Sequence, residues 1–261
     1  MQNLGNRRRQ TEANTASPND ATLPDGVVLR AAGVEKRYGS RLPFRRSVEV
    51  LTGANLTLVA GEIVGVVGEN GSGKSTLMKI LVGALDADSG SVTRRGTVGW
   101  CPQDPLLYDR LTVDETFRLF GSAYGLPPDE IERAASRLAD RLDFESYRDY
   151  RVENLSGGNR QKVNLGVSLL HDPDVLFLDE PYTGFDWETY LSFWDLTEEL
   201  VERGTGICVI SHLINERERF DRICELRDGK LYEQRADQVG DDGGDVAVAD
   251  PADGEGVDGS A

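Results

Sequence analysis

Residues 68–76, Gly-Glu-Asn-Gly-Ser-Gly-Lys-Ser-Thr, fit the pattern GxxxxGK[ST], in which glycines precede a lysine and a hydroxyl. Such a loop lets backbone N–H groups curve around an anion, while the lysine reaches the terminal phosphates and the hydroxyl ligates magnesium. We therefore predict a phosphate site with Lys74 on the phosphates and Ser75 on Mg²⁺. The residues predicted to form it are Gly68, Asn70, Gly71, Ser72, Gly73, Lys74, Ser75 and Thr76.

Two adjacent carboxylates, Asp179 and Glu180, could supply the acid–base part of this chemistry. They follow the apolar run 175–178, which is typical of a central parallel strand buried on both faces. Open α/β sheets bind their ligands at the carboxyl ends of such strands. We expect Asp179 to hold the water shell of Mg²⁺ and Glu180 to accept a proton from an attacking water.

The elements that would position these groups can be read on either side of them. The apolar run 63–67 leads into the loop as a strand, and residues 77–84 carry apolar side chains at helical spacing. A helix N-terminus would then point at the phosphates. The stretch 27–59 is rich in strand patterns, the run 206–211 predicts another buried strand, and Asp228-Gly229 predicts a hairpin near the C-terminal end.

A region of helices separates the two chemical motifs. Thr112 and Glu115 have the spacing of a capping box and predict a helix start. After the break at 127–128, residues 129–144 carry an apolar helical stripe. We expect a helical insert at about 104–156. Its end would bring a second Gly-rich helix start, which is a potential anion site.

The composition limits the partners that the chain can have. Its 261 residues carry a formal net charge of −16, and such an acidic surface repels the phosphates of nucleic acids, so no nucleic-acid partner is expected. An acidic, lysine-poor chain is also similar to proteins of salt-loving organisms. Three cysteines without a CxxC pair and only two histidines argue against a zinc site, and His171 is expected to be structural.

The two ends of the chain differ from its middle. Residues 1–25 are polar and contain three consecutive arginines, and residues 236–261 contain eight acids and no Lys or Arg. Both are expected to be disordered. The chain lacks an apolar run long enough for a membrane span and the apolar core of a signal peptide, so a cytoplasmic location is expected.

The order of these motifs resembles the nucleotide-binding subunit of an ATP-binding cassette (ABC) transporter, over roughly residues 27–235. The resemblance implies ATP and Mg²⁺ as ligands. It also implies an α/β fold over 26–235: a P-loop NTPase core with a parallel sheet, an N-terminal antiparallel β subdomain and an inserted helical subdomain.

The resemblance further implies roles for residues that no single pattern assigns. Tyr38 matches the aromatic that stacks on adenine, Gln103 the glutamine that senses Mg²⁺ and the membrane partner, and His212 the switch histidine at the γ-phosphate. Residues 155–159 match the family signature and 183–186 the loop that contacts the dimer partner. The implied catalytic set is Glu180, His212, Lys74 and Gln103, the metal set is Ser75, Gln103 and Asp179, and the signature residues on nucleotide are Ser156, Gly157 and Gly158.

Two positions depart from the usual family pattern. Asn159 stands in the signature where glutamine is commoner, and Phe185 stands in the dimer-contact loop where leucine is usual. Asn159 keeps an amide but has a shorter reach, which would tune the contact to nucleotide without abolishing it.

The implied assembly is a sandwich dimer of identical or related subunits that closes on ATP. An integral membrane permease, encoded separately, would hold it at the cytoplasmic face of the cell membrane. The segment 105–126 is similar to exporters of multidrug and polysaccharide type, which favours export over import. A soluble ABC ATPase of translation, DNA repair or iron–sulfur assembly is the alternative. A P-loop kinase or GTPase is disfavoured, because neither gives a role to the signature or to His212.

Overall fold

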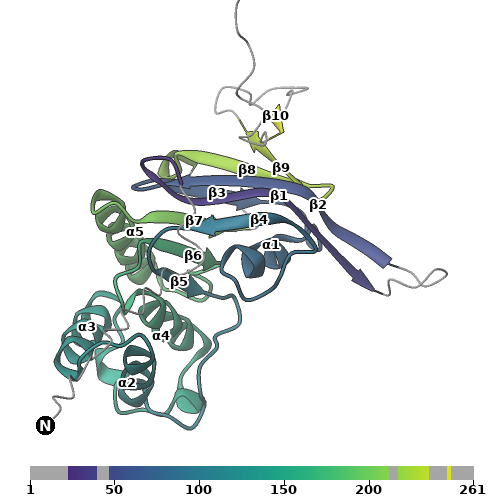
Figure 1. Ribbon diagram of the computed structural model, residues 1–261. Helices are drawn as coiled ribbons and strands as arrows, with labels where there is room; N and C mark the ends of the chain where they lie inside the picture. The colour runs from purple at the N-terminus through teal and green to yellow at the C-terminus, as the bar shows by residue number, and fades with distance from the viewer. Residues whose placement is uncertain (1–22, 40–46, 212–216, 235–245, 248–261) are drawn as a thin grey trace, which may run out of the picture.

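The computed structural model of the chain describes residues 23–39, 47–211, 217–234 and 246–247. A seven-stranded sheet with the order β10-β9-β8-β3-β7-β6-β5 runs through the molecule (Figure 1). The five strands from β8 to β5 are parallel, β9 is antiparallel to β8, and β10 is antiparallel to β9. The strands are β3 (Ile63–Val67), β5 (Val98–Cys101), β6 (Val175–Asp179), β7 (Gly206–Ile210), β8 (Arg222–Arg227), β9 (Lys230–Gln234) and β10 (Val246–Ala247).

A second sheet is antiparallel and has the order β2-β1-β4. It consists of β1 (Val27–Gly39), β2 (Ser47–Val59) and β4 (Ser89–Arg94). Within the strand-rich stretch 27–59, β2 is one strand of 13 residues. Its register with β1 is irregular at several points, and the strand continues through these irregularities.

The helices differ in where they lie relative to the antiparallel sheet. Helix α1 follows β3, and α2 and α3 lie away from the antiparallel sheet in Figure 1. Their bounds are α1 (Lys74–Leu81), α2 (Val113–Ala123), α3 (Pro128–Arg141), α4 (Gly157–Leu169) and α5 (Trp187–Glu202), with short 3-10 turns at Glu145–Tyr147, Val152–Asn154 and Arg217–Arg219. No helix in these described ranges combines the length and apolar character needed to cross a membrane.

Strands β3, β6 and β7 are buried on both faces, as their apolar runs predict. Phe177 of β6 packs in a core with α1 and the antiparallel sheet, whereas its neighbour Leu178 packs in a second core with α2 to α5. Because successive side chains of a strand point to opposite faces, a parallel strand between two layers must be apolar at every position. The polar exception is Asp179 at the end of the strand.

Local signals are confirmed where they rest on neighbouring residues. The Thr112 hydroxyl accepts from the Glu115 N–H at 3.1 Å, and the Glu115 carboxylate accepts from the Thr112 N–H at 2.9 Å, which closes the capping box of α2. The hairpin between β8 and β9 turns at Asp228 and Gly229, both with positive φ. Helix α3 ends at Arg141 rather than near 144, because Asp143 takes a left-handed conformation (φ 52°).

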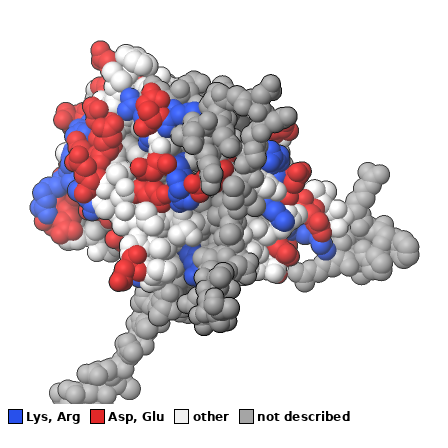
Figure 2. Space-filling model, turned by 90° about the horizontal axis from the view of Figure 1, so that it is seen from above, with Lys and Arg blue, Asp and Glu red and all other residues white. Residues whose placement is uncertain are grey.

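Charge is mixed on the face shown in Figure 2, where the described Lys and Arg side chains lie among Asp and Glu side chains. Among the described residues, Arg148 forms ion pairs with Asp114 at 2.6 Å and Glu132 at 2.5 Å. A protein that binds a nucleic-acid backbone needs a continuous basic surface. The described part of this face offers none.

Candidate active site

The phosphate loop joins β3 to α1 and is shaped by its glycines. Gly73 has φ 108°, and a Cβ added there would lie 2.7 Å from a side-chain carbon of Val50. Gly68 is equally confined, since a Cβ would lie 2.7 Å from the Leu226 carbonyl oxygen. Only glycine combines this backbone conformation with this close approach. Helix α1 begins at Lys74, inside the loop, so its N-terminus faces the loop. No side chain caps its first turn.

Lys74 lies within this loop with its side chain largely buried. Its ammonium donates to the carbonyl oxygens of Gly68, at 2.6 Å, and Glu69, at 2.9 Å. Burial lowers the pKa of Lys74, and the nearby carboxylates of Glu180 and Asp179 oppose that shift. The lysine therefore connects the loop to the acidic pair electrostatically.

The acidic pair lies where β6 ends. Asp179 is only 7% exposed. Glu180 has φ 49°, a conformation that a non-glycine residue rarely adopts, and its N–H donates to the Ile210 carbonyl at 3.0 Å. A carboxylate oxygen of Glu180 accepts from the Gln103 amide at 3.1 Å. The strained turn thus aims Glu180 at Gln103, a residue 77 positions earlier in the chain.

One cavity of about 340 Å³ brings these groups together. Its lining includes Val50, which no sequence pattern predicts. Gly68 and Ser72 belong to the loop but do not line the cavity, and the Ser72 hydroxyl is buried without a partner among the described atoms. The predicted residues that line it are Asn70, Gly71, Gly73, Lys74, Ser75, Thr76, Gln103, Asp179 and Glu180.

Tyr38 lies on the strand pair beside this cavity. It is 45% exposed and pairs with Val48 across β1 and β2. Directly paired residues share a face of the sheet, so Tyr38 and Val48 lie on one face. Val50, two residues from Val48, lines the cavity, so the end of the strand pair that carries Tyr38 lies beside it.

The signature residues lie elsewhere. The Ser156 hydroxyl caps α4 by accepting from the Asn159 N–H at 3.2 Å, and both Ser156 and Gly157 are exposed. None of these residues lines the cavity of its own chain. A Cβ on Gly158 would lie 2.3 Å from the Gly184 carbonyl oxygen, so the signature turn packs directly on the predicted dimer-contact loop.

Comparison with known proteins identifies this arrangement. The family model described as ABC transporter matches residues 51–183. The chain belongs to the ABC transporter family. A Nod factor export ATP-binding protein I of Rhizobium sp. (strain N33) is 33% identical over 217 residues, which cover 78% of this chain and 69% of that protein. A probable multidrug ABC transporter ATP-binding protein of Escherichia coli (strain K12) is 34% identical over 220 residues, which cover 80% of this chain and 37% of that protein.

Solved structures agree with this assignment. The structure of an ATP-binding subunit of an ABC transporter matches with a TM-score of 0.72 and 26% identity, over 80% of this chain and 90% of that one. A dimeric cassette in a post-hydrolysis state, bound to ADP and Pi, matches with a TM-score of 0.72 and 25% identity, over 79% and 98% of the two chains. The expected α/β cassette fold, with its parallel core and antiparallel β sheet, is confirmed.

His212 follows Ser211 directly but lies outside the described residues. Residues 1–22 and most of the acidic tail also lie outside the described residues. Two hydrogen bonds hold Ser211 in position: its N–H donates to the Val66 carbonyl at 3.2 Å, and its hydroxyl accepts from the Tyr182 hydroxyl at 3.0 Å. The role of His212 therefore stays a prediction.

Lys162 was not singled out from the sequence, although it is among the most buried charged residues described in the cassette. Its ammonium lies 3.5 Å from the Asp143 carboxylate and 3.3 Å from that of Asp186. Asp186 also accepts from the Thr189 N–H at 2.8 Å, which caps α5. The Thr189 backbone and hydroxyl, with Lys162, lower the pKa of Asp186 to about 2. A buried cation thus links the signature helix α4 to the dimer-contact loop.

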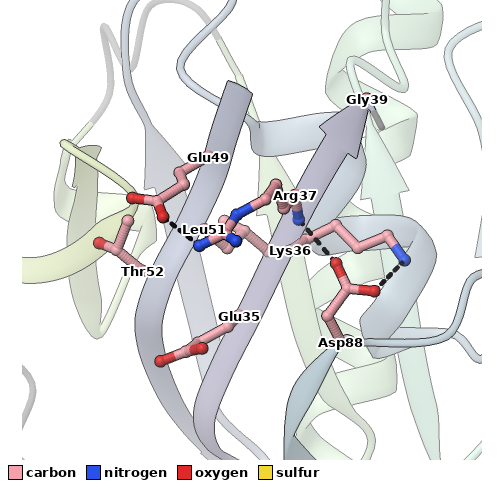
Figure 3. Close-up of a pocket in the computed structure, with 8 residues that line it drawn as sticks. All are labelled: Glu35, Lys36, Arg37, Gly39, Glu49, Leu51, Thr52 and Asp88. Carbon is pink, nitrogen blue, oxygen red and sulfur yellow. Dashed lines mark hydrogen bonds and ion pairs between the residues drawn. The ribbon is translucent and has the colours of Figure 1, made fainter. Parts of the chain in front are cut away.

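A second cavity, of about 370 Å³, lies along β1 and β2 and is shown in Figure 3. Its cations are already neutralised, because Lys36 pairs with Asp88 at 3.4 Å and Arg37 pairs with Glu49. Both ion pairs are drawn in Figure 3 between the lining side chains. The first cavity, with a glycine loop and a helix N-terminus, is the better anion site.

An apolar groove of about 330 Å³ opens between α1, β5 and α2. Leu106, 59% exposed, lies on it, and Tyr124 stacks on His171 at a ring separation of 3.7 Å. His171 Nε2 donates to the Val98 carbonyl at 3.1 Å, which agrees with a structural histidine. The residues that line the groove are Val82, Gly83, Ala84, Val98, Trp100, Pro102, Leu106, Phe120, Tyr124, Asn164 and Val167.

Proposed function

We propose that this cassette hydrolyses ATP to drive export through a separate integral membrane permease. The observation that carries the proposal is the single cavity shared by the phosphate loop, Gln103 and the Asp179–Glu180 pair. Relatives named for Nod factor export and multidrug transport support the exporter class.

The donor set of the cavity fits a magnesium-bound triphosphate. Loop N–H groups, the N-terminus of α1 and the Lys74 ammonium suit the phosphates. The Ser75 hydroxyl, the Gln103 side-chain oxygen and Asp179 are oxygen donors, which Mg²⁺ prefers. When bound, Mg²⁺ neutralises charge that develops on the phosphate oxygens. Tyr38 would stack on the adenine.

Glu180 is the proposed general base. Its carboxylate accepts a proton from water, the water oxygen bonds to the γ-phosphorus, and the bond from that phosphorus to the bridging oxygen breaks to leave ADP and phosphate. Gln103 orients the carboxylate through the 3.1 Å hydrogen bond. His212 is proposed to contact the γ-phosphate and hold the attacking water.

The signature is proposed to act on the nucleotide of a second copy. Ser156 and Gly157 are exposed at the start of α4 and do not line their own cavity. One helix N-terminus cannot neutralise a triphosphate, so a second one supplied by the partner makes closure depend on the γ-phosphate. The dimeric cassettes among the structural neighbours support this assembly.

The permease is proposed to dock a short helix with apolar side chains in the groove. A contiguous apolar groove marks an interaction surface, and Leu106 is 59% exposed on this one. Pro102, which also lines the groove, directly precedes Gln103. This contact would hold the chain at the cytoplasmic face of the membrane. Leu106→Asp should abolish co-purification of the permease, whereas Leu119→Asp, at an exposed leucine outside the groove lining, should not.

The proposed base is tested by Glu180→Gln. We expect ATP turnover to fall about 10²- to 10⁴-fold with ATP still bound, which is the range for loss of a general base. Glu202→Gln is the matched control, because Glu202 is exposed at the end of α5, away from the cavity. Phosphate release and nucleotide binding are measured for both. Near-normal hydrolysis by Glu180→Gln would exclude Glu180 as the base.

A further inference from the structure

Asn164 is a buried amide on α4 that the proposed chemistry does not use. It is 4% exposed and lies two turns after the signature serine. Its side-chain nitrogen donates to the Pro102 carbonyl at 2.9 Å and lies 3.2 Å from the Cys101 sulfur. Burial of an amide is unfavourable unless the amide is hydrogen-bonded, so the bond to Pro102 determines the orientation of the Asn164 side chain.

The surroundings of Asn164 are otherwise mostly apolar. Val163 and Leu165, its neighbours on the helix, are core residues, and Val167 lines the groove with it. Gln161 makes long contacts to the same amide, at 3.5 Å, and to the Cys101 sulfur, at 3.7 Å. An apolar side chain would pack here without needing a partner. The amide therefore adds a specific link rather than packing.

That link joins two parts of the proposed site. Pro102 directly precedes Gln103, and the Gln103 amide donates to the Glu180 carboxylate at 3.1 Å. At its other end, α4 begins at the signature turn that faces a partner's nucleotide in the proposed dimer. Asn164 and Pro102 also line the groove proposed for the permease. A movement of α4, or of the residues that line the groove, would displace the Pro102 carbonyl through this one hydrogen bond.

We propose that Asn164 is a positioning residue for ATP hydrolysis, which sets Gln103 against Glu180 according to the position of α4. The inference rests on the proposed function. The 2.9 Å bond to the Pro102 carbonyl transmits displacement of the helix to the turn that carries Gln103. Asn164 touches no reacting atom and acts through Gln103.

The test replaces the amide with a side chain of similar size and no donor. Asn164→Leu should lower kcat about 3- to 10-fold, the effect of one lost hydrogen bond, and leave the KM for ATP within about twofold. Ser168→Ala is the matched control, because the Ser168 hydroxyl is also buried on α4 but bonds to the Leu165 carbonyl of its own helix, at 2.7 Å. It should keep the wild-type kcat.

A double-mutant cycle separates positioning from general stability. If Asn164 acts through Gln103, adding Asn164→Leu to Gln103→Ala should lower kcat no further. Asn164→Ala serves in the same cycle if the leucine variant does not fold. A wild-type kcat in a folded Asn164 variant, or effects that multiply in the double variant, would overturn the inference. Absence of ATP hydrolysis by the wild-type chain would instead refute the proposed function.

Discussion

Gly158→Ala tests the packing of the signature turn on the dimer-contact loop. A methyl group at Gly158 would lie 2.3 Å from the Gly184 carbonyl oxygen, whereas ordinary contacts begin at about 3.4 Å. The obstacle is backbone on a loop that Lys162 and the α5 cap hold in place. The alanine therefore cannot be accommodated by rotation of a side chain.

The size of the effect follows from that geometry. The two backbones must separate by about 1 Å, and overpacking of this kind destabilises proteins by about 1–3 kcal/mol. Gly157 is the matched control, since a methyl group there meets no described atom within 4 Å. Gly157→Ala in the first turn of α4 should change the free energy of unfolding by at most about 1 kcal/mol, in the stabilising direction.

The assay is urea denaturation of the purified variants, followed by tryptophan fluorescence. We expect the midpoint of Gly158→Ala to fall and that of Gly157→Ala to stay or rise, with equal slopes. Equal midpoints for Gly158→Ala and wild type would mean that the start of α4 does not pack on Gly184.

Three further variants test separate parts of the account. Tyr38→Ala should weaken ATP binding about 2- to 10-fold, by loss of stacking, and leave the binding of inorganic triphosphate unchanged. Equal weakening of the binding of both ligands would mean that Tyr38 does not contact the adenine. Thr112→Ala should lower the free energy of unfolding by about 1 kcal/mol in urea denaturation, by loss of the α2 cap, with ATP affinity unaltered; an unchanged stability would deny the capping box a role. Asp186 has a pKa of about 2 in the folded chain, below the ordinary value, so its carboxylate stabilises the fold at neutral pH and this stabilisation is lost as the pH falls from about 4 to about 2. The destabilisation caused by Asp186→Ala should therefore shrink over that range; a difference from wild type that does not change with pH would contradict the shift.

Features set by neighbouring residues could be predicted from the sequence. The phosphate loop, the capping box at Thr112 and the turn at Asp228 each depend on a few consecutive positions, and each lies where its pattern indicates. The buried central strands could be predicted too, because a parallel strand covered on both faces must be apolar throughout. The resemblance then supplied Gln103, and the structure brings it to Glu180.

Features set by distant residues could not be predicted in the same way. Asn164 meets Pro102 across 62 positions, and Lys162 meets Asp186 across 24, and no periodic pattern encodes either pair. Each contact arises only because the sheet places the start of α5 and the end of β5 against α4. The same holds for Val50, which β2 brings to the phosphate cavity.

In the proposed dimer, ATP joins two copies of this chain through the phosphate loop of one and the signature of the other. Light scattering of Glu180→Gln with ATP and Mg²⁺ measures this association, because slow hydrolysis preserves the closed form. We expect the mass to double with ATP and not with ADP. We expect Ser156→Arg, added to the same variant, to prevent the doubling while ATP still binds. A mass that stays that of one chain with ATP bound would contradict the proposed dimer.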